Sequence, residues 1–415
     1  MLKAQFSFRH GALLIVAAAL IADLVMIALF RAMPPMLSLG DTPAFIAQAR
    51  NPWSHGFEPP AYPLFLSVVL PFGATWVVAV QALISVGSAL FTYSRTRMLW
   101  LALAIVACPF LIIFDFQLLT ETLTCHLVWV GLVLLVWPRR SWEPLLAGIL
   151  FGAGALTRDT LYLLPVVLVI AGARSPFFKS ALLAAAVAFL TVLPWQVAHG
   201  TVKISDGRGG FALWIGTWER NADWQLPGIP NAAWPAAAFR SPEERQQVVT
   251  AIRDRDEAPM TAIALDRIRS EPGAVLETWA IRYPRLWIGT RTDSLQLRFQ
   301  RGAVGWYVLK LAFFALNLAI MMLALLGAWR LRREPTARLV AVPIIYLGVI
   351  LIPFHNTEPR YSLPAMIPLL FFAGHALLSV KRAPLSHGRA KDGPPRSYEL
   401  RNRPPTLSAN LESRP

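Results

Sequence analysis

The run GALLIVAAALIADLVMIALF, residues 11–30, carries a single charged residue, Asp23, in twenty. About 20 apolar residues are what an α-helix needs to cross the hydrocarbon core of a bilayer. Lys3 and Arg9 precede the run, as basic residues precede a signal peptide, but the apolar core of a cleaved signal is only roughly 7–15 residues long. The sequence therefore predicts that this run is a first transmembrane helix.

The composition of the whole chain agrees with a membrane location. Of 415 residues, 55% are hydrophobic and 15% are charged, whereas soluble domains are about 45–50% apolar and about 25% charged. The net charge of +15 does not indicate a nucleic-acid partner, because basic residues in a membrane chain mark its orientation. Cys108 and Cys125 lie in apolar runs and are expected to be buried thiols.

Hydropathy predicts an all-α integral membrane protein with about ten transmembrane or re-entrant helices. The pair at 144–156 and 160–173 is short, and we expect its two helices to meet at Thr157-Arg158-Asp159. The predicted spans are 11–30, 64–91, 98–114, 117–137, 144–156, 160–173, 179–195, 306–329, 337–354 and 362–380.

The basic residues of the short loops fall on alternate sides of successive spans. Placing all of them in the cytoplasm satisfies the positive-inside rule. They are Lys3, Arg9, Arg95, Arg97, Arg139, Arg140, Arg174, Lys179, the group from Arg330 to Arg338, Lys381 and Arg382. The remaining polar segments then share the periplasmic or exterior face of the cell inner (plasma) membrane. They are 31–63, 115–121, 157–159, 196–305 and 355–361.

Residues 196–305 form too long a segment for a structureless loop, and we expect a small helical extracytoplasmic subdomain. Ser241-Pro242-Glu243-Glu244 is a capping box, and further helices are expected from Pro259 to Ile268 and from Pro272 to about Trp287. Its tryptophans suit a surface on the headgroup layer; they are Trp214, Trp218, Trp224 and Trp234. The predicted organisation is a transmembrane module at 1–195, the subdomain at 196–305, transmembrane helices at 306–380 and a disordered basic cytoplasmic tail at 381–415.

Asp41 is the first candidate for chemistry, in Gly40-Asp41-Thr42-Pro43 between two membrane helices. A carboxylate held in a dry site can act as an acid–base group, but Asp after Gly is also a common turn former. Glu121 can cap a helix start, act as a second carboxylate, or supply half of a divalent-metal site with Asp41. The two alternatives for Asp41 and the three for Glu121 stay open.

Two arginines are candidates for binding an anion. Arg158 lies between short apolar helices, where it can bind phosphate or pair with Asp159. Arg360 lies in the cluster that begins at His355 and ends at Tyr361, where it can neutralise phosphate while Tyr361 lines a lipid groove. The alternative for the Arg360–Tyr361 pair is an interfacial anchor.

Several short motifs, in their order along residues 1–380, resemble the GT-C class of polytopic membrane glycosyltransferases. The resemblance is to the bacterial branch related to aminoarabinose transferases and to dolichyl- or polyprenyl-phosphate-mannose protein mannosyltransferases. The motifs are Gly40-Asp41, Tyr62-Pro63-Leu64-Phe65, Thr120-Glu121, Gly154-Ala155-Leu156-Thr157-Arg158, Leu193-Pro194-Trp195, Ile268-Arg269-Ser270-Glu271-Pro272-Gly273 with Leu286-Trp287, and Arg360-Tyr361-Ser362-Leu363-Pro364.

The resemblance implies a cell-envelope transferase that moves a sugar from a polyprenyl-phosphate donor to a glycan, lipid or protein acceptor at the outer face. It implies that Asp41 is the general base or a metal-proximal carboxylate, assisted by Glu121. It implies that Arg158 and Arg360 are candidates for binding the donor phosphate. Tyr62, His355 and Tyr361 are further candidate substrate-binding residues. The chain departs from the family pattern at Thr42, where many members have a second acidic residue, and at Ala198-His199, where an Arg-Asn pair is common.

Two other classes of protein are alternatives. A polymerase or ligase of envelope polysaccharide would use Arg and His of the large outer loop in place of Asp41. A transporter of lipid-linked sugars would carry paired broken helices in two matching halves, which the sequence lacks. No P-loop or dinucleotide-binding fingerprint is found, so a nucleotide-sugar donor in a cytosolic domain is not expected.

Overall fold

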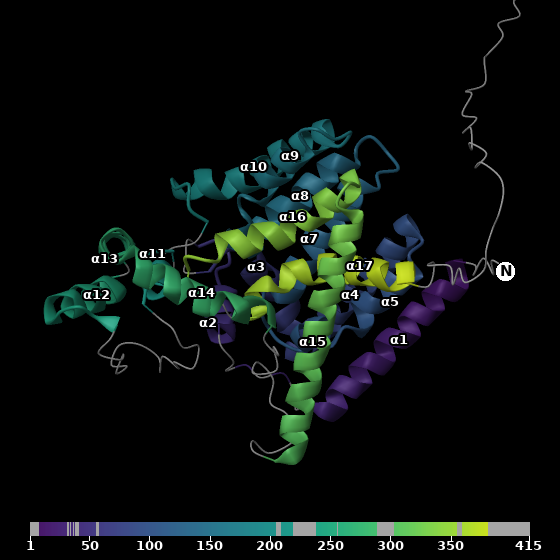
Figure 1. Cartoon of the computed structure of the whole chain (residues 1–415), viewed down its shortest axis with the longest axis horizontal. Helices are drawn as coiled ribbons and strands as arrows, with labels where there is room; N and C mark the ends of the chain where they lie inside the picture. The colour runs from purple at the N-terminus through teal and green to yellow at the C-terminus, as the bar shows by residue number, and fades with distance from the viewer. Residues whose placement is uncertain are drawn as a thin grey trace, which may run out of the picture.

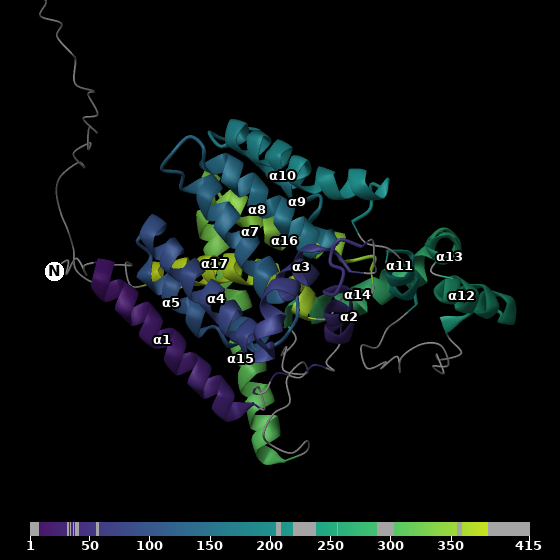
Figure 2. The same ribbon diagram turned by 180° about the vertical axis from the view of Figure 1, so that it is seen from behind.

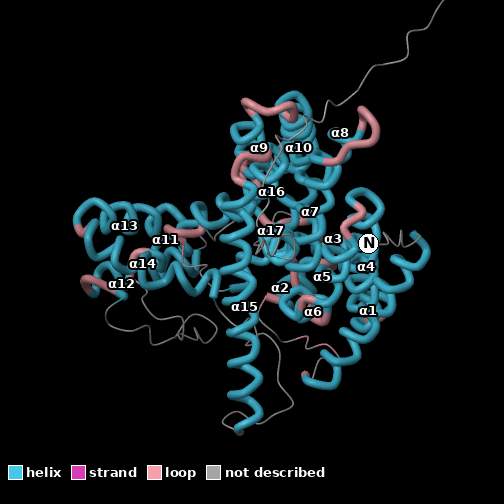
Figure 3. Tube along the Cα trace, turned by 45° about the vertical axis from the view of Figure 1, so that its right-hand side comes forward, coloured by secondary structure: helices cyan, strands magenta, loops and turns pink. Residues whose placement is uncertain are grey.

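The structure, a computed structural model, describes residues 8–30, 33, 35, 37, 41–54, 58–204, 209–218, 238–254, 256–288, 303–354 and 359–380. Within these ranges the regular elements are all helices and there is no strand, as Figure 3 shows. The all-α prediction is therefore confirmed for the part of the chain that is described. The predicted tail at 381–415 lies outside the described residues, as does His355.

In the part of the chain that the structure describes, five helical segments are long and apolar enough to cross a membrane. Four of them leave a wide apolar surface uncovered by the rest of the protein, as expected for a helix that contacts lipid, whereas the fifth, Arg360–Leu378, is mostly buried. They are α1 (Phe8–Leu29), α4 (Ala74–Thr96), α10 (Phe178–His199), α15 (Val304–Leu331) and the segment Arg360–Leu378, which joins η5 (Pro359–Ala365) to α17 (Met366–Val380). The chain thus has the features of a multi-pass membrane protein.

Shorter apolar helices complete the bundle. They are α3 (Ala61–Val69), α5 (Leu99–Ala107), α6 (Pro109–Asp115), α7 (Glu121–Val136), α8 (Glu143–Thr157), α9 (Leu164–Gly172) and α16 (Pro335–Ile350). As predicted, the helix that ends at Thr157 meets the next one through a short turn, in which Arg158 has extended backbone and η2 (Asp159–Leu161) follows.

Two predicted spans are wrong as single helices. The run 64–91 is divided into α3, η1 (Leu70–Phe72) and α4, because Gly73 adopts a φ of 114°, which side-chain-bearing residues rarely adopt. The run 98–114 is divided into α5 and α6, because Cys108 precedes a proline and is held out of the helical region, with ψ at 112°. Hydropathy does not register such breaks, since both sides of each are equally apolar.

Helix α7 lies at the centre of the bundle, where Figures 1 and 2 show it among α4, α8, α16 and α17. Of its 16 residues, all except Leu123, Leu127 and Val130 are buried. Its neighbour α8 packs closely on α10, because a Cβ atom at Gly148 or Gly152 would lie 2.5 or 2.7 Å from a carbonyl oxygen of α10. Small residues four apart permit such close packing of membrane helices. Glu121, the first residue of α7, is buried with most of the helix.

At the end of the bundle predicted to face the cytoplasm, the loop before α8 is tied to α4. Glu143 is almost fully buried and accepts hydrogen bonds from Arg95 Nη1 at 2.9 Å and from the backbone N–H of Arg139 at 2.8 Å. Arg139 also donates to the carbonyl of Ser94. Arg95 and Arg139 therefore share one end of the bundle, as the charge pattern predicts.

A helical lobe, defined as residues 209–218, 238–254 and 256–288, extends from one end of the bundle, at the left in Figure 1. It contains α11 (Gly209–Gly216), α12 (Pro242–Asp254), α13 (Glu257–Ser270) and α14 (Pro272–Ile288). Trp214, Val248, Met260 and Ala264 form a small core of their own. The predicted cap is present, since the backbone N–H of Glu244 donates to Ser241 Oγ at 3.2 Å.

The prediction that the tryptophans of this segment lie on the headgroup layer is wrong for Trp214. Its side chain is fully buried, and its ring packs against Trp218 and Phe239 at centroid distances of 5.4 and 5.7 Å. Aromatic side chains supply most of the apolar area that a small core can bury. Trp224 and Trp234 lie outside the described residues.

The lobe joins the bundle where α11 ends. Trp279 Nε1 and Arg282 Nη2, both from α14, donate to the carbonyl of Gly216 at 3.0 and 2.9 Å. On its other side Gly216 lies against Pro353, just after α16, so closely that a Cβ atom would be 1.9 Å from the Pro353 carbonyl oxygen.

Gly216→Ala is therefore expected to destabilise the junction between lobe and bundle, because backbone atoms on both sides must shift. Such overpacking costs about 1–3 kcal/mol. Thermal unfolding in detergent would measure the loss. Gly273→Ala in α14 is the matched control, since a Cβ atom there meets nothing within 4 Å. Equal melting temperatures for the two variants would contradict the contact.

Candidate active site

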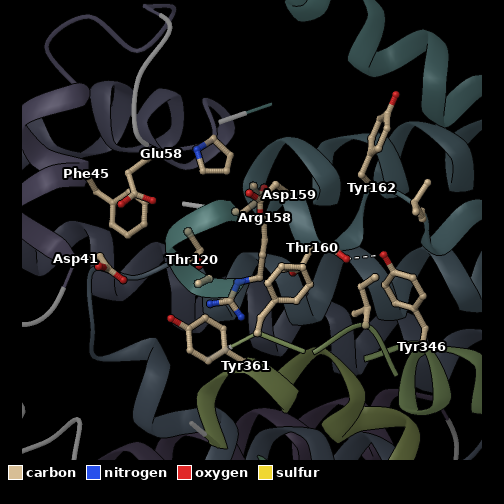
Figure 4. Close-up of a pocket in the computed structure, with 17 residues that line it drawn as sticks. Asp41, Phe45, Glu58, Thr120, Arg158, Asp159, Thr160, Tyr162, Tyr346 and Tyr361 are labelled. Carbon is tan, nitrogen blue, oxygen red and sulfur yellow. Dashed lines mark hydrogen bonds between the residues drawn. The ribbon is translucent and has the colours of Figure 1, made fainter. Parts of the chain in front are cut away.

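A cavity of about 320 Å³ lies where the bundle meets the lobe. Its walls come from the first loop with α2 (Thr42–Gln48), from the turn between α8 and α9, and from α11, α16 and η5. Figure 4 shows these side chains converging on one space. The lining residues are Asp41, Phe45, Glu58, Pro59, Thr120, Thr157, Arg158, Asp159, Thr160, Tyr162, Leu163, Gly209, Ala212, Tyr346, Ile350, Phe354 and Tyr361.

Asp41 occupies the N-cap position of α2, but its carboxylate makes no capping hydrogen bond within the described segment 41–54. Its Oδ2 atom lies 3.4 Å from Arg360 Nη1. The next residue, Thr42, is fully buried and donates from Oγ1 to the carbonyl of Leu118 at 3.1 Å. The backbone beside Asp41 is thus anchored to the buried turn that precedes α7, and the carboxylate turns towards the cavity and Arg360.

Arg158 and Glu121 form a buried ion pair at the cavity wall. Arg158 Nη2 lies 2.8 Å from Glu121 Oε1, and their side chains are 10% and 1% exposed. Within the described part of the chain, Arg158 Nη1 and Glu121 Oε2 are buried and have no hydrogen-bond partner. Leaving a buried polar atom unsatisfied costs about 1–3 kcal/mol. The ion pair is with Glu121, on another helix, and not the local pair with Asp159 considered from the sequence.

Tyr361 brings the two arginines together. The Cζ atoms of Arg158 and Arg360 each lie 4.9 Å from the centre of its ring, and Arg360 Nη2 donates to its hydroxyl at 3.1 Å. The electron-rich face of an aromatic ring attracts a cation without neutralising it. Four residues predicted from the sequence, Asp41, Arg158, Arg360 and Tyr361, are therefore neighbours, and Glu121 lies directly behind Arg158.

Two other polar residues of the cavity, Glu58 and Tyr346, were not predicted from the sequence. Glu58 supplies a carboxylate, and its backbone is held by Gln48, whose Nε2 donates to the Glu58 carbonyl at 2.8 Å. Tyr346 lies inside an apolar span and donates its hydroxyl to the carbonyl of Thr160 at 2.5 Å, as drawn in Figure 4. A polar residue next to Pro59-Pro60 and a lone tyrosine in a span were the available signals.

Tyr62 is not among the lining residues. It is fully buried, and its hydroxyl donates to Gln81 Oε1 at 3.0 Å. Gln81 Nε2 in turn donates to the carbonyls of Asp115 and Gln117 at 2.9 and 2.7 Å. Tyr62 therefore supports the turn that leads into Glu121, and the structure does not bring it to the cavity. His355, the remaining predicted binding residue, lies outside the described residues.

The residues do not fit a divalent-metal site. Asp41 and Glu121 each have an arginine beside them. Among the residues that the structure describes, no group of three or more His, Cys, Asp or Glu side chains is arranged to hold a metal ion. The carboxylates of Asp41 and Glu121 are therefore placed to pair with arginines.

Comparison with known proteins does not assign the chain to a family. No protein-family profile matches the chain, and no curated protein matches its sequence. The chain is distantly similar to a solved structure, that of an archaeal oligosaccharyltransferase, AglB from Archaeoglobus fulgidus, in complex with an inhibitory peptide and a dolichol-phosphate. It is 14% identical, with a TM-score of 0.45, over 91% of this chain and 52% of that one. The chain spans about half the length of that protein, and the likeness is too distant to assign a function.

Proposed function

We propose that the chain is a membrane glycosyltransferase that takes a sugar from a polyprenyl-phosphate donor and transfers it to an acceptor at the outer face of the membrane. The observation that carries the proposal is Arg158. Its guanidinium lies at a cavity wall with one buried nitrogen, Nη1, that finds no partner among the described residues. Guanidinium groups bind phosphate through paired charge-assisted hydrogen bonds.

The phosphate of the donor binds beside Tyr361. Arg158 Nη1 donates to it, and Arg360, 4.9 Å from the same ring, adds a second positive charge. The glycosidic oxygen gains negative charge as the sugar leaves, so fixed cations at this point stabilise the transition state more than the ground state. Glu121 holds Arg158 in place from behind.

The sugar and the lipid occupy the rest of the cavity. Carboxylates accept hydrogen bonds from sugar hydroxyls, and Glu58 and Asp159 line the space beside the phosphate position. Beyond them the wall is apolar, with Leu163, Ile350 and Phe354. Leu163 is half-exposed and directly precedes α9, which packs on α16. The prenyl chain leaves the cavity past Leu163 and enters the bilayer.

Asp41 is the base of the reaction. Its carboxylate takes the proton from an acceptor hydroxyl, the hydroxyl oxygen forms a bond to the anomeric carbon, and the bond from that carbon to the phosphate oxygen breaks. The electron pair leaves with the polyprenyl phosphate, which is a good leaving group, so the transfer needs no ATP. The protein supplies positioning, a base and positive charge.

The proposal is tested by mass spectrometry of envelope glycolipids and glycans from cells with and without the protein. We expect one glycan, lipid or protein in the envelope to lose a single sugar when the protein is absent, and to regain it with the wild-type chain but not with Asp41→Asn. Loss of long polysaccharide chains, restored by Asp41→Asn, would instead indicate a polymerase or ligase.

A further inference from the structure

Helix α14 exposes an apolar face. One side of it, with Val275, Thr278, Arg282 and Leu286, is buried against the lobe and the bundle. Outside this buried stripe Leu276, Ile281 and Tyr283 are 59%, 43% and 37% exposed. The exposed residues from 274 to 284 include one charge: Ala274, Leu276, Glu277, Ala280, Ile281, Tyr283 and Pro284.

Helix α12 of the same lobe has a polar exposed face. It also buries one side, through Val248 and Ala251. Its exposed residues are almost all polar or charged: Pro242, Glu243, Arg245, Gln246, Gln247, Arg253 and Asp254. Two helices of the same lobe thus present different faces outward. The polar face of α12 is well solvated by water. Each Å² of apolar surface that α14 leaves in water costs about 25 cal/mol of free energy.

The exposed face of α14 continues an apolar surface of the bundle. A Cβ atom at Gly348 in α16 would lie 2.9 Å from the Tyr283 hydroxyl and 3.2 Å from the Trp287 ring, so the two helices touch there. On either side of Gly348, Ile345 and Val349 of α16 are 60% and 62% exposed. These belong to the uncovered apolar surface of a bundle built to cross a membrane.

We propose that α14 lies in the headgroup layer of the membrane leaflet on the cavity side, with Leu276, Ala280, Ile281 and Tyr283 among the lipid chains. A helix with an apolar face of this kind lies in the plane of the interface and does not cross it. Tyr283 suits this depth, because its ring is apolar and its hydroxyl is polar. The inference does not depend on the proposed reaction.

The position of α14 in the headgroup layer also sets the depth of the cavity in the membrane. The C-terminal end of α14 is fixed to the bundle, because Ser362 Oγ donates to the Leu286 carbonyl at 2.7 Å and Asn317 Nδ2 to the Trp287 carbonyl at 2.6 Å. Ser362 follows Tyr361 directly. A helix held in the headgroup layer and fixed next to Tyr361 sets the cavity at the depth where lipid phosphates lie.

Fluorescence quenching in nanodiscs tests this placement. Single cysteines at Leu276 and Ile281 would be labelled with an environment-sensitive fluorophore in the full chain, in nanodiscs of phosphatidylethanolamine and phosphatidylglycerol. Cys108 and Cys125 are buried and should not react. The matched control is Leu265→Cys on α13, which is 40% exposed and followed by exposed Asp266.

We expect lipids with a nitroxide near the headgroup to quench the labels at 276 and 281 several-fold more strongly than the label at 265, and aqueous iodide to show the reverse order. All three positions are at the surface, so the variants should melt at the wild-type temperature. Iodide quenching at 276 and 281 as strong as at 265 would overturn the proposal, whatever the outcome of the activity tests.

Discussion

Replacing Asp41 by asparagine is expected to abolish sugar transfer while the protein remains folded. The amide has nearly the shape of the carboxylate but cannot accept the proton of the acceptor hydroxyl. General-base catalysis contributes about 10²–10⁴-fold to a rate, and the loss should be of that order. The measurement is transfer of labelled sugar in membranes supplied with a polyprenyl-phosphate sugar, at equal amounts of protein.

Asp254→Asn is the control for this change. Asp254 lies on the exposed side of α12, where it pairs with Arg253 at 2.8 Å, and it is outside the cavity lining. It should transfer sugar at the wild-type rate. Activity of Asp41→Asn close to that of Asp254→Asn would mean that another group takes the proton, or that the reaction is of another kind.

The second large effect is expected at Arg158, where Arg158→Gln should destabilise the protein strongly. Removing the guanidinium leaves Glu121, which is 1% exposed, as an uncompensated buried charge. Breaking a buried ion pair from one side typically costs about 3–5 kcal/mol. Arg158→Gln combined with Glu121→Gln should recover most of that loss, because no charge then remains without its partner.

Thermal unfolding of the detergent-solubilised variants measures this effect. The matched control is Arg253→Gln, which breaks an ion pair on the surface and should not change the melting temperature measurably. Because the double variant restores stability but not the guanidinium, it should bind a polyprenyl phosphate no more tightly than the matching polyprenol. Unchanged stability of Arg158→Gln would contradict the buried pair seen in the structure.

The fold was largely predictable from the apolar runs, because only helices satisfy their own backbone hydrogen bonds in lipid. The errors lie where one apolar run contains two helices. At Gly73 and Cys108-Pro109 the backbone geometry ends a helix without any change in hydropathy. The lobe was predicted in outline by the signals at Ser241 and Pro272, whereas the burial of Trp214 was not, since an aromatic residue suits both a core and an interface.

The part of the site that could be predicted is the set of residues whose connections lie on the same side of the membrane. Asp41, Arg158 and Arg360 lie in connections predicted to share one side of the membrane, and the short turn between α8 and α9 leaves Arg158 little freedom. Tyr62 belongs to the same sequence pattern but points into the bundle towards Gln81. Glu58 and Tyr346 enter the cavity through contacts between distant elements, which no local pattern in one sequence encodes.

The central claim is that this cavity binds a lipid-borne phosphate through Arg158. The most direct measurement compares the binding of a polyprenyl phosphate and of the matching polyprenol to the purified protein and to the Arg158→Gln, Glu121→Gln double variant. Hydrogen bonds to charged groups are worth about 1.5–3 kcal/mol, so the phosphate should bind the wild type roughly ten- to hundredfold more tightly than the alcohol. The double variant should lose this preference. Equal affinity of the wild type for both lipids, or a preference that the double variant keeps, would contradict the account.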